Sequence, residues 1–308
     1  MDIISNSFNI DKKSISDSEN LEKVICFLTG GNKYVFKPAP KGPDGLPALE
    51  SSFNEIIISN LAQFLKINCI KVHMACFKDD KNKFKNKYGI MMEDYNEYGS
   101  KAFYGLYFLD YYYEYLKEEG LLKDLTYLDK NDALECMNNM KTIHDALYYY
   151  FDYLDNKDEI IDKIMDEMAV RFCFDYLTMQ SDRHMKNWAV LLSPLKPPVL
   201  SKMFDNELSF DLYFSPRMKF SNYNETKEET LYNFLNSSDK YKEMFLEMYN
   251  TLDVETFVGL IEKIEEANGK FTSNMYKLNI IKNYEKNYKK ITELLIGKNI
   301  ITGDKHAR

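Results

Sequence analysis

DRHMKN, at residues 182–187, is the stretch of sequence that decides the fold. It stands between a predicted helix and a predicted strand, and MFDN follows at residues 203–206, at the end of a second predicted strand. Metal-dependent phosphoryl transfer needs a carboxylate near the attacking hydroxyl, and an Asn and a second Asp to hold the magnesium ion. Asp182, Asn187 and Asp205 supply these oxygen groups in chain order.

A lysine and a glutamate upstream extend this pattern. Residues 23–38 read as two short β-rich runs around Gly30-Gly31, which predicts a hairpin because glycine tolerates a positive φ. Lys37 lies on the second strand of that hairpin, and Glu55 lies on the helix predicted next. An ion pair between the two would aim the lysine at nucleotide phosphates.

The first part of the chain predicts a small β-rich lobe. Ser51 or Ser52 is expected to cap a helix over FNEIIISNLAQFLKI, in which apolar residues recur at helical spacing. Strands are expected at residues 70–77 and 88–92. Residues 1–95 therefore read β-β-α-β-β.

Residues 96–308 predict a mostly helical second lobe. Apolar stripes run through residues 134–154 and 161–172, and the short strands expected within this lobe are WAVLL (188–192) and SKMFD (201–205), joined by a proline-marked turn. Further helices are expected at residues 227–236, 239–250, 254–268 and 273–296. The whole pattern predicts an α+β, protein-kinase-like fold with two lobes, a hinge near residue 95 and an ATP cleft between the lobes.

Composition excludes several other classes. The chain has 308 residues, a net charge of -8, 45% hydrophobic residues and 12 glycines, and it contains neither GxGxxG nor a Walker A sequence. An acidic balance disfavours direct nucleic-acid binding, and no apolar run is long enough to predict a membrane span. The five cysteines form no CxxC pair, which argues against a zinc site or a disulfide framework. Without a signal-peptide pattern we expect a cytoplasmic protein, and an unconventional secretion route would leave no mark in the sequence.

DRHMKN with FDN, preceded by YVFKP and by NE on the following helix, resembles the HipA-like protein kinases. This family belongs to the wider atypical group that is shared with phosphoinositide 3- and 4-kinases. The resemblance is closest to the compact, stand-alone bacterial members, and it extends from about Lys23 to the region of Asn250. Kinases of the eukaryotic type carry the order HRD, so DRH argues for the atypical group.

The resemblance implies ATP and Mg2+ as cofactors and a role for each matching residue. In these roles Asp182 is the catalytic base, with His184 beside it in the loop, and Asn187 and Asp205 are the magnesium ligands. Lys37 is the phosphate-binding lysine and Glu55 is its helix partner. Met92-Glu93-Asp94 is the hinge whose backbone meets adenine.

Two departures from the family pattern stand out. The family usually has a glycine two positions after the metal-binding Asp, where this chain has Glu207. The family also covers the phosphates with a loop that often bears glycine and an autophosphorylated serine, and here that stretch is DKKSISDSEN, with Ser14, Ser16 and Ser18 but no glycine. Phosphate on one of these serines would add about -1.5 to -2 charges and expel the loop from the ATP site.

Each candidate also has an ordinary structural explanation. Asp182 and Asn187 would equally suit a polar connection between a helix and a strand, and Lys37 an exposed strand position. Glu55 would suit the first turn of a helix. Trp188 follows the loop directly and is expected to pack beneath it.

The sequence thus predicts a Mg-ATP-dependent serine/threonine protein kinase of HipA-like type that autophosphorylates. Its partner would be a protein substrate with a Ser or Thr hydroxyl, and a cognate antitoxin or regulator is a further partner to consider. Two alternatives fit the same motifs. One is a lipid or small-molecule kinase, and the other is a nucleotide-binding regulator or toxin-type partner protein with little or no transfer activity.

Overall fold

The computed structural model describes two compact units. The first comprises Met1–Tyr95, Phe204–Ser209 and Glu255–Ile281, and the second comprises Asn96–Met203, Phe210–Val254 and Lys282–Arg308. Within them the backbone is described for residues 2–4, 9–10, 16–18, 21–27, 33–39, 49–77, 87–94, 99–122, 125–211, 213–268 and 273–302. Side chains are described from Tyr34 onward, apart from those of residues 76, 77, 87 and 268 within these ranges.

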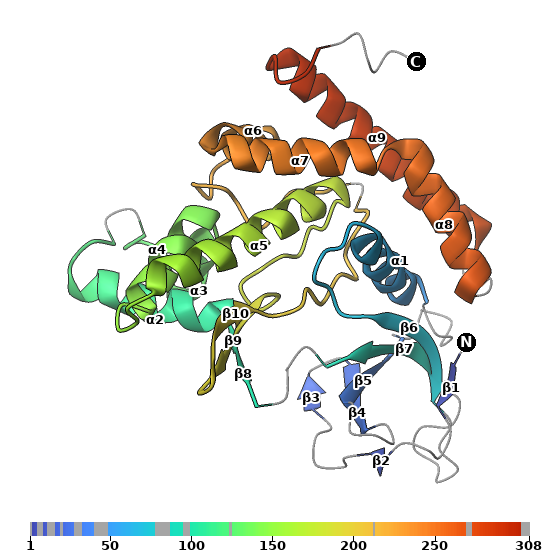
Figure 1. The fold of residues 1–308 in the computed structure, drawn as a ribbon, viewed down its shortest axis with the longest axis horizontal. Helices are drawn as coiled ribbons and strands as arrows, with labels where there is room; N and C mark the ends of the chain where they lie inside the picture. The colour runs from blue at the N-terminus through green and yellow to red at the C-terminus, as the bar shows by residue number, and fades with distance from the viewer. Residues whose placement is uncertain are drawn as a thin grey trace. The chain divides into compact units, whose positions relative to one another are not determined.

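The first unit is built on a sheet (Figure 1). Its strands are β1 (Asp2–Ile4), β2 (Asn9–Ile10), β3 (Ser16–Ser18), β4 (Leu21–Phe27), β5 (Lys33–Pro38), β6 (Val72–Phe77) and β7 (Lys87–Glu93). They follow the order β1-β6-β7-β5-β4-β2, with β3 paired to β4, and among these pairs only β1 and β6 run parallel. The predicted hairpin is confirmed as β4 and β5, in which Val24 opposes Phe36, and its turn lies outside the described residues.

One long helix covers this sheet. Helix α1 (Glu50–Phe64) packs against β6 and buries Phe53, Ile57 and Leu61 at helical spacing. The predicted serine cap is wrong, because the helix begins two to three residues earlier: Leu49 occupies the cap position without a side-chain hydrogen bond, and both serines lie inside the helix. Glu50 in the first turn favours this earlier start, since an acid there complements the helix dipole.

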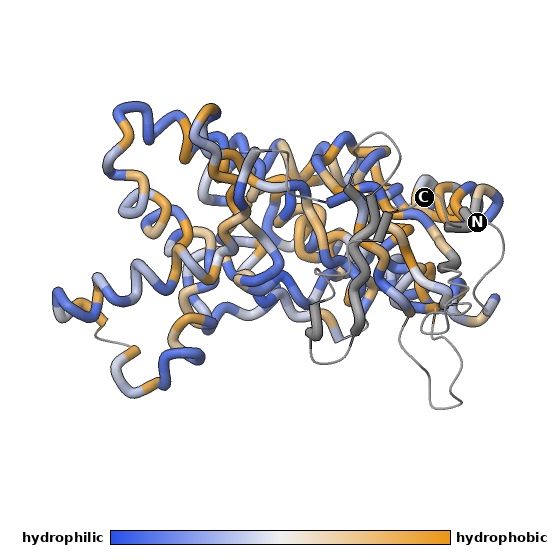
Figure 2. Tube along the Cα trace, turned by 90° about the horizontal axis from the view of Figure 1, so that it is seen from below, coloured by the Kyte–Doolittle hydropathy of each residue, from blue (hydrophilic) through white to orange (hydrophobic). Residues whose placement is uncertain are grey.

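The second unit is mostly helical, as predicted. Its helices are α2 (Gly105–Glu118), α3 (Lys130–Cys136), α4 (Met140–Tyr150), α5 (Lys157–Leu177), α6 (Lys227–Ser237) and α7 (Asp239–Thr251). Helix α5 contacts α4 and α7, and Figure 2 shows hydrophobic and hydrophilic stretches alternating along the chain. In the tail, α8 (Val254–Asn268) from Glu255 onward and the first part of α9 (Asn274–Gly297) belong to the first unit. The four helices predicted for the tail are all confirmed within a few residues.

The apolar stripe over residues 134–154 belongs to two helices instead of one. The chain leaves α3 after Cys136, and Asn139 starts α4 by accepting a hydrogen bond from the Thr142 N–H on its side chain. An asparagine at this position favours a new helix start, because its amide oxygen satisfies an otherwise unpaired N–H group.

A small antiparallel sheet lies in the second unit, with the order β10-β9-β8. It joins β8 (Lys101–Tyr104), β9 (Ala189–Ser193) and β10 (Lys196–Leu200). The strand predicted at residues 201–205 is therefore wrong, and the proline pair expected in the turn forms part of β10. Proline is tolerated there because β10 pairs on one side only, with a register irregularity between Lys196 and Val199.

None of the helices in the described part of the chain combines the length and the apolar character needed to cross a membrane.

Candidate functional site

Lys37 lies among three carboxylates within the first unit. Its Nζ atom is 2.7 Å from Glu207 Oε2, 3.3 Å from Asp205 Oδ1 and 3.7 Å from Glu55 Oε1. Strand β5 supplies the lysine and helix α1 supplies Glu55, as the sequence predicted. Asp205 and Glu207 come from the segment of residues 204–209, which belongs to this unit although it lies far away in the sequence.

Burial shapes the charge state of this group. Lys37 and Glu55 are 7% and 1% exposed, so neither is well solvated. Burial opposes the charge on Lys37, but the carboxylates of Asp205, Glu55 and Glu207 outweigh it and raise the lysine pKa. Burial also raises the pKa of Glu55 to about 7, against the opposing effect of Lys37. The lysine is therefore firmly cationic, and burial makes Glu55 easier to protonate than an ordinary glutamate.

Helix α1 holds the segment that carries Asp205. Asn54 donates from Nδ2 to the backbone oxygens of Glu207 and Ser209 at 2.9 and 3.1 Å, and Glu55 Oε2 accepts from the Asn206 N–H at 3.0 Å. Asp205 itself has φ 58°, a left-handed conformation that is uncommon for aspartate. Strain of this kind persists only where the surroundings fix it, and here two adjacent helix residues do so.

The predicted hinge residues end the central strand β7. Met92 pairs with Val35 on one side and with Val72 on the other, and the Glu93 N–H donates to the Lys71 carbonyl at 3.2 Å. Asp94 follows the strand. Their contact with adenine stays a prediction.

Of the three candidate serines, Ser16 and Ser18 lie in β3, which pairs with β4, so this part of the predicted loop is a strand. Ser14 lies outside the described residues.

In the second unit, Asp182 and Asn187 come together as predicted. Asn187 donates from Nδ2 to the Asp182 backbone oxygen at 2.7 Å and lies 3.5 Å from its Oδ2 atom. The loop also turns on itself, because the His184 N–H bonds the Asp182 carbonyl and the Asn187 N–H bonds the His184 carbonyl. With its amide nitrogen occupied in this way, Asn187 has its amide oxygen available to accept a hydrogen bond or bind a cation.

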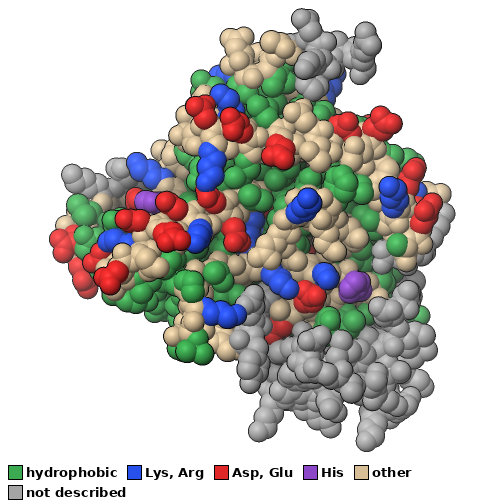
Figure 3. Space-filling view, in the orientation of Figure 1, with side chains coloured by type: hydrophobic (Ala, Val, Ile, Leu, Met, Phe, Trp, Pro, Cys, Tyr) green, Lys and Arg blue, Asp and Glu red, His purple; other side chains and the backbone are tan. Residues whose placement is uncertain are grey.

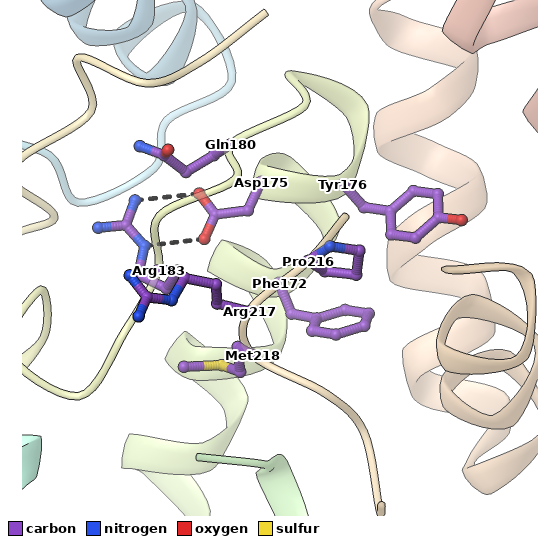
Figure 4. A pocket seen from close by; sticks show the side chains of 8 residues that line it. All are labelled: Phe172, Asp175, Tyr176, Gln180, Arg183, Pro216, Arg217 and Met218. Carbon is purple, nitrogen blue, oxygen red and sulfur yellow. Dashed lines mark hydrogen bonds and ion pairs between the residues drawn. The ribbon is translucent and has the colours of Figure 1, made fainter. Parts of the chain in front are cut away.

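Arg183 is the structural centre of the loop. Its guanidinium forms two hydrogen bonds of 2.8 and 3.0 Å with the Asp175 carboxylate, drawn in Figure 4, and a third of 3.0 Å with the Asn187 carbonyl. Asn138 donates to the Arg183 carbonyl at 3.0 Å. Arg183 is 2% exposed, so it is a buried residue that steadies the loop through the Asp175 carboxylate. Trp188 beneath the loop is 1% exposed and stacks on Phe108.

Arg217 and His184 flank the Asp182 carboxylate. Arg217 Nη1 lies 2.7 Å from Asp182 Oδ1, and its Nη2 lies 3.3 Å from Glu135. His184 Nε2 lies 3.7 Å from Asp182 Oδ2. Because His184 Nδ1 accepts from the Lys186 N–H, a neutral His184 carries its proton on Nε2, facing Asp182.

The donor chemistry suits a hard divalent cation. Glu55, Asp205 and Glu207 each offer one carboxylate oxygen within 4.8 Å of the others, and Glu55 Oε1 is buried without a hydrogen-bond partner among the described residues. Magnesium prefers such oxygen ligands, so this acidic group fits the cation that the sequence predicted. Lys37 also lies within this group, which means that a bound cation would share its carboxylates with the lysine.

Two solved structures share this architecture. The kinase CtkA of Helicobacter pylori, described as proinflammatory, matches with a TM-score of 0.66 and 16% sequence identity over 98% of this chain and 99% of that one. HipA of Shewanella oneidensis MR-1, solved in a toxin–antitoxin complex with HipB and operator DNA, matches with a TM-score of 0.53 and 12% identity over 89% of this chain and 64% of that one.

The chain has the HipA-like kinase fold. Its small β-rich part corresponds to the N-lobe of that fold and its helical part to the C-lobe, as the sequence predicted. No protein-family model and no curated protein sequence matches the chain.

Three residues around the site escaped the sequence analysis: Asn54, Asp175 and Arg217. Asn54 precedes Glu55 directly, so the NE pair on the helix was a visible signal for it. Asp175 faces Arg183 from eight residues upstream, across the end of α5, and Arg217 reaches Asp182 from 35 residues downstream. Nothing in the local pattern distinguishes these last two from ordinary surface residues.

Proposed function

We propose that this chain is a Mg-ATP-dependent serine/threonine protein kinase of HipA-like type that phosphorylates itself. The observation that carries the proposal is the position of the Lys37 ammonium, which lies near Glu55 and Asp205. The resemblance assigns phosphate binding to Lys37, metal binding to Asp205 and the support of the lysine to Glu55. The paired Asp182 and Asn187 and the kinase-like fold support it independently.

The residues of the first unit would bind the nucleotide. Lys37 bonds phosphate oxygens, while Glu55 holds the lysine and the Asn206 backbone in place. The resemblance assigns magnesium to Asp205 of this unit and to Asn187 of the second unit, and a bound magnesium ion would neutralise charge on the phosphates. Met92, Glu93 and Asp94 would meet adenine through their backbone, and Ser14, Ser16 and Ser18 would lie over the phosphates.

Asp182 would orient the substrate hydroxyl and accept its proton. Its backbone carbonyl and carboxylate are fixed by Asn187, and Arg217 holds the other carboxylate oxygen. A fixed carboxylate lowers the barrier mainly by positioning the nucleophile, since phosphoryl transfer demands little covalent chemistry from the protein. The substrate is a protein hydroxyl, and a cognate antitoxin remains a partner to test, as the HipA complex contains one.

Transfer of labelled phosphate from ATP tests this proposal. Asp182→Ala and Asp205→Ala should each lower self-labelling by at least about 100-fold, because each removes a group needed in the transition state. Asp155→Ala, at an exposed position, is the matched control and should label like the parent protein. Circular dichroism confirms that the variants are folded, and mass spectrometry of the product shows whether Ser14, Ser16 or Ser18 carries the phosphate. Full labelling of either site variant would contradict the roles assigned here.

One observation favours a second candidate, a nucleotide-binding regulator with weak transfer activity. Glu207 stands where the family usually has glycine, and at 2.7 Å it is the nearest carboxylate to Lys37. A carboxylate that holds the lysine competes with nucleotide phosphates for the same charge. Thermal stabilisation by Mg-ATP without labelling of any serine, or of an added protein, would select this candidate.

A further inference from the structure

A group of three lysines lines a pocket within the second unit. The pocket is bounded by Lys227 at the start of α6, by Lys286 and Lys290 on α9, and by Phe214 and Asp211. Lys286 and Lys290 are four residues apart, so they lie on the same face of the helix. This lysine cluster is not visible in the sequence, because Lys227 is about 60 residues away from the other two lysines.

Lys227 is held rigidly at the pocket wall. Its Nζ atom donates to Asn287 Oδ1 at 2.8 Å and lies 4.5 and 5.5 Å from the ring centroids of Phe214 and Tyr176. Asn287 is itself fixed, since its amide nitrogen donates to the backbone oxygens of Tyr176 and Leu177. The ammonium group therefore has a defined position before any ligand arrives, which reduces the entropy cost of binding.

The three lysines of this group lack a paired carboxylate in the described part of the chain. Among the residues that the structure describes, none of the three lysines forms an ion pair with a carboxylate, although Asp211 lines the same pocket. Burial and the nearby Lys290 lower the pKa of Lys227 to about 8, against the opposing effect of Glu228. A lowered lysine pKa is the expected result when an ammonium is partly desolvated without a matching anion.

The charge count indicates which anion fits. Three lysines and one aspartate leave a local charge of about +2, which a dianion neutralises and a single carboxylate does not. Lysine is a common phosphate ligand because its compact ammonium offers three donors to phosphate oxygens. We propose that Lys227, Lys286 and Lys290 form a binding site for a phosphate group, either free inorganic phosphate or the phosphate monoester of a phosphorylated serine.

Such a site would connect α9 with residues that flank the candidate catalytic groups. Met179, three residues before Asp182, also lines the pocket, and Phe214 follows the segment that carries Asp205. Asn283 on the same helix face already donates to the Phe210 carbonyl at 3.1 Å. A bound phosphate would add a second link between α9 and residues 210–214 of the same unit.

Titration calorimetry with inorganic phosphate tests the site. The protein carries Lys37→Met, so that phosphate binding at the nucleotide site does not contribute. In this background the double variant Lys286→Gln/Lys290→Gln should bind phosphate at least about tenfold more weakly, since charged hydrogen bonds are lost. Lys282→Gln/Lys289→Gln removes the same charge from exposed positions of α9 outside the pocket, and it should change the affinity by less than about twofold. Equal losses in both double variants, or no measurable binding of any phosphate probe, would overturn the proposal.

Two further arms identify the source of the phosphate. A phosphoserine peptide that binds tighter than inorganic phosphate, and loses that advantage in Lys286→Gln/Lys290→Gln, supports a phosphorylated polypeptide. Free phosphate that binds at least as well as the peptide supports the inorganic ion. Lys227→Met should weaken the binding of both the phosphoserine peptide and inorganic phosphate. Because Lys227 is half-buried, circular dichroism must show that the variant is folded. The measurement uses no ATP turnover, so its outcome is independent of whether the chain transfers phosphate.

Discussion

At the scale of single residues, Glu207 is where this chain departs most from the HipA-like pattern that it resembles. In place of the glycine usual in that pattern, a carboxylate lies 2.7 Å from the Lys37 ammonium. The backbone of the same residue is held by Asn54, so the carboxylate cannot move far without disturbing the Asp205 segment. A nucleotide phosphate that binds Lys37, as proposed, would have to compete with Glu207.

Replacing this carboxylate should tighten nucleotide binding. We expect Glu207→Gln to lower the Kd for Mg-ADP by roughly tenfold, because a charge-assisted bond to Lys37 no longer has to be broken. Titration calorimetry measures this change, and Glu207→Asp, which keeps the charge, is the control. A weaker affinity in Glu207→Gln would instead assign Glu207 a positive role in holding the metal.

The candidate site residues stand out in the sequence, and the residues that hold them in place do not. Lys37, Glu55, Asp182 and Asn187 stand out because their types and order are rare together. Arg217 does not, because an arginine in a loop is common and its contact with Asp182 depends on how the loop folds.

At the scale of elements, the spacing of apolar residues predicted the helices well. The errors lie at an edge strand and at the boundary between two helices. The prolines at residues 197–198 predict a turn, but they lie in β10, because an edge strand does not need every N–H group. The stripe through residues 134–154 kept one period across two helices, and only the cap at Asn139 marks the break. Both errors arise because the contacts that an element makes with its neighbours decide its structure against the local sequence pattern.

The start of α2 depends on the absence of a side chain. A β-carbon on Gly105 would overlap the indole of Trp188, whose carbonyl accepts the Gly105 N–H at 3.0 Å. Gly105→Ala should therefore lower the free energy of unfolding by about 1–3 kcal/mol through overpacking. Trp188 is the single tryptophan of the chain, so its fluorescence reports the change directly.

Gly259→Ala in α8 is the matched control for this substitution. Nothing lies near its added β-carbon, so the helix should gain up to about 1 kcal/mol. Unchanged stability and fluorescence in Gly105→Ala would show that the tryptophan does not pack as described.

The loop before α6 depends on an ionised glutamate. Glu225 accepts from the Ser221 hydroxyl at 2.6 Å, from Asn233 at 2.8 Å and from the Phe220 N–H at 3.0 Å. Burial opposes its charge, but these hydrogen bonds outweigh burial and lower the pKa of Glu225 below its usual 4.5. A carboxylate with a lowered pKa stabilises the fold above about pH 4.5 and loses this effect as the pH falls through its folded value.

Glu225→Gln should accordingly destabilise the protein by about 1–3 kcal/mol at pH 7. Because glutamine does not titrate, the difference from the parent protein should shrink as the pH falls below about 4.5. Urea denaturation at several pH values measures this, with Glu247→Gln on the exposed face of α7 as the control. A difference that does not change with pH would indicate that shape alone, and not charge, is responsible.

At the scale of the whole molecule, an acidic chain concentrates its useful positive charge at a few positions. The net charge is -8, and Figure 3 shows acidic and basic side chains interspersed over the face in view. Lys37 is surrounded by carboxylates, whereas Lys227 and its neighbours on α9 have none bound to them among the described residues. The low glycine content excluded glycine-rich nucleotide loops, but it gave no information about either cluster, since both are assembled by the fold.

Nucleotide binding should be measurable as a change in the stability of the whole protein. Mg-ADP at about one hundred times its Kd should add about 2.7 kcal/mol to the free energy of unfolding, which raises Tm by a few degrees. Chelation of magnesium should remove most of this gain, because the carboxylates of Asp205 and Glu207 then face the phosphates without a cation. Lys37→Met should abolish it, while Asp182→Asn, which changes only the group assigned to the substrate hydroxyl, should keep it. Differential scanning calorimetry makes the comparison, and an undiminished gain in Lys37→Met would show that the nucleotide binds elsewhere.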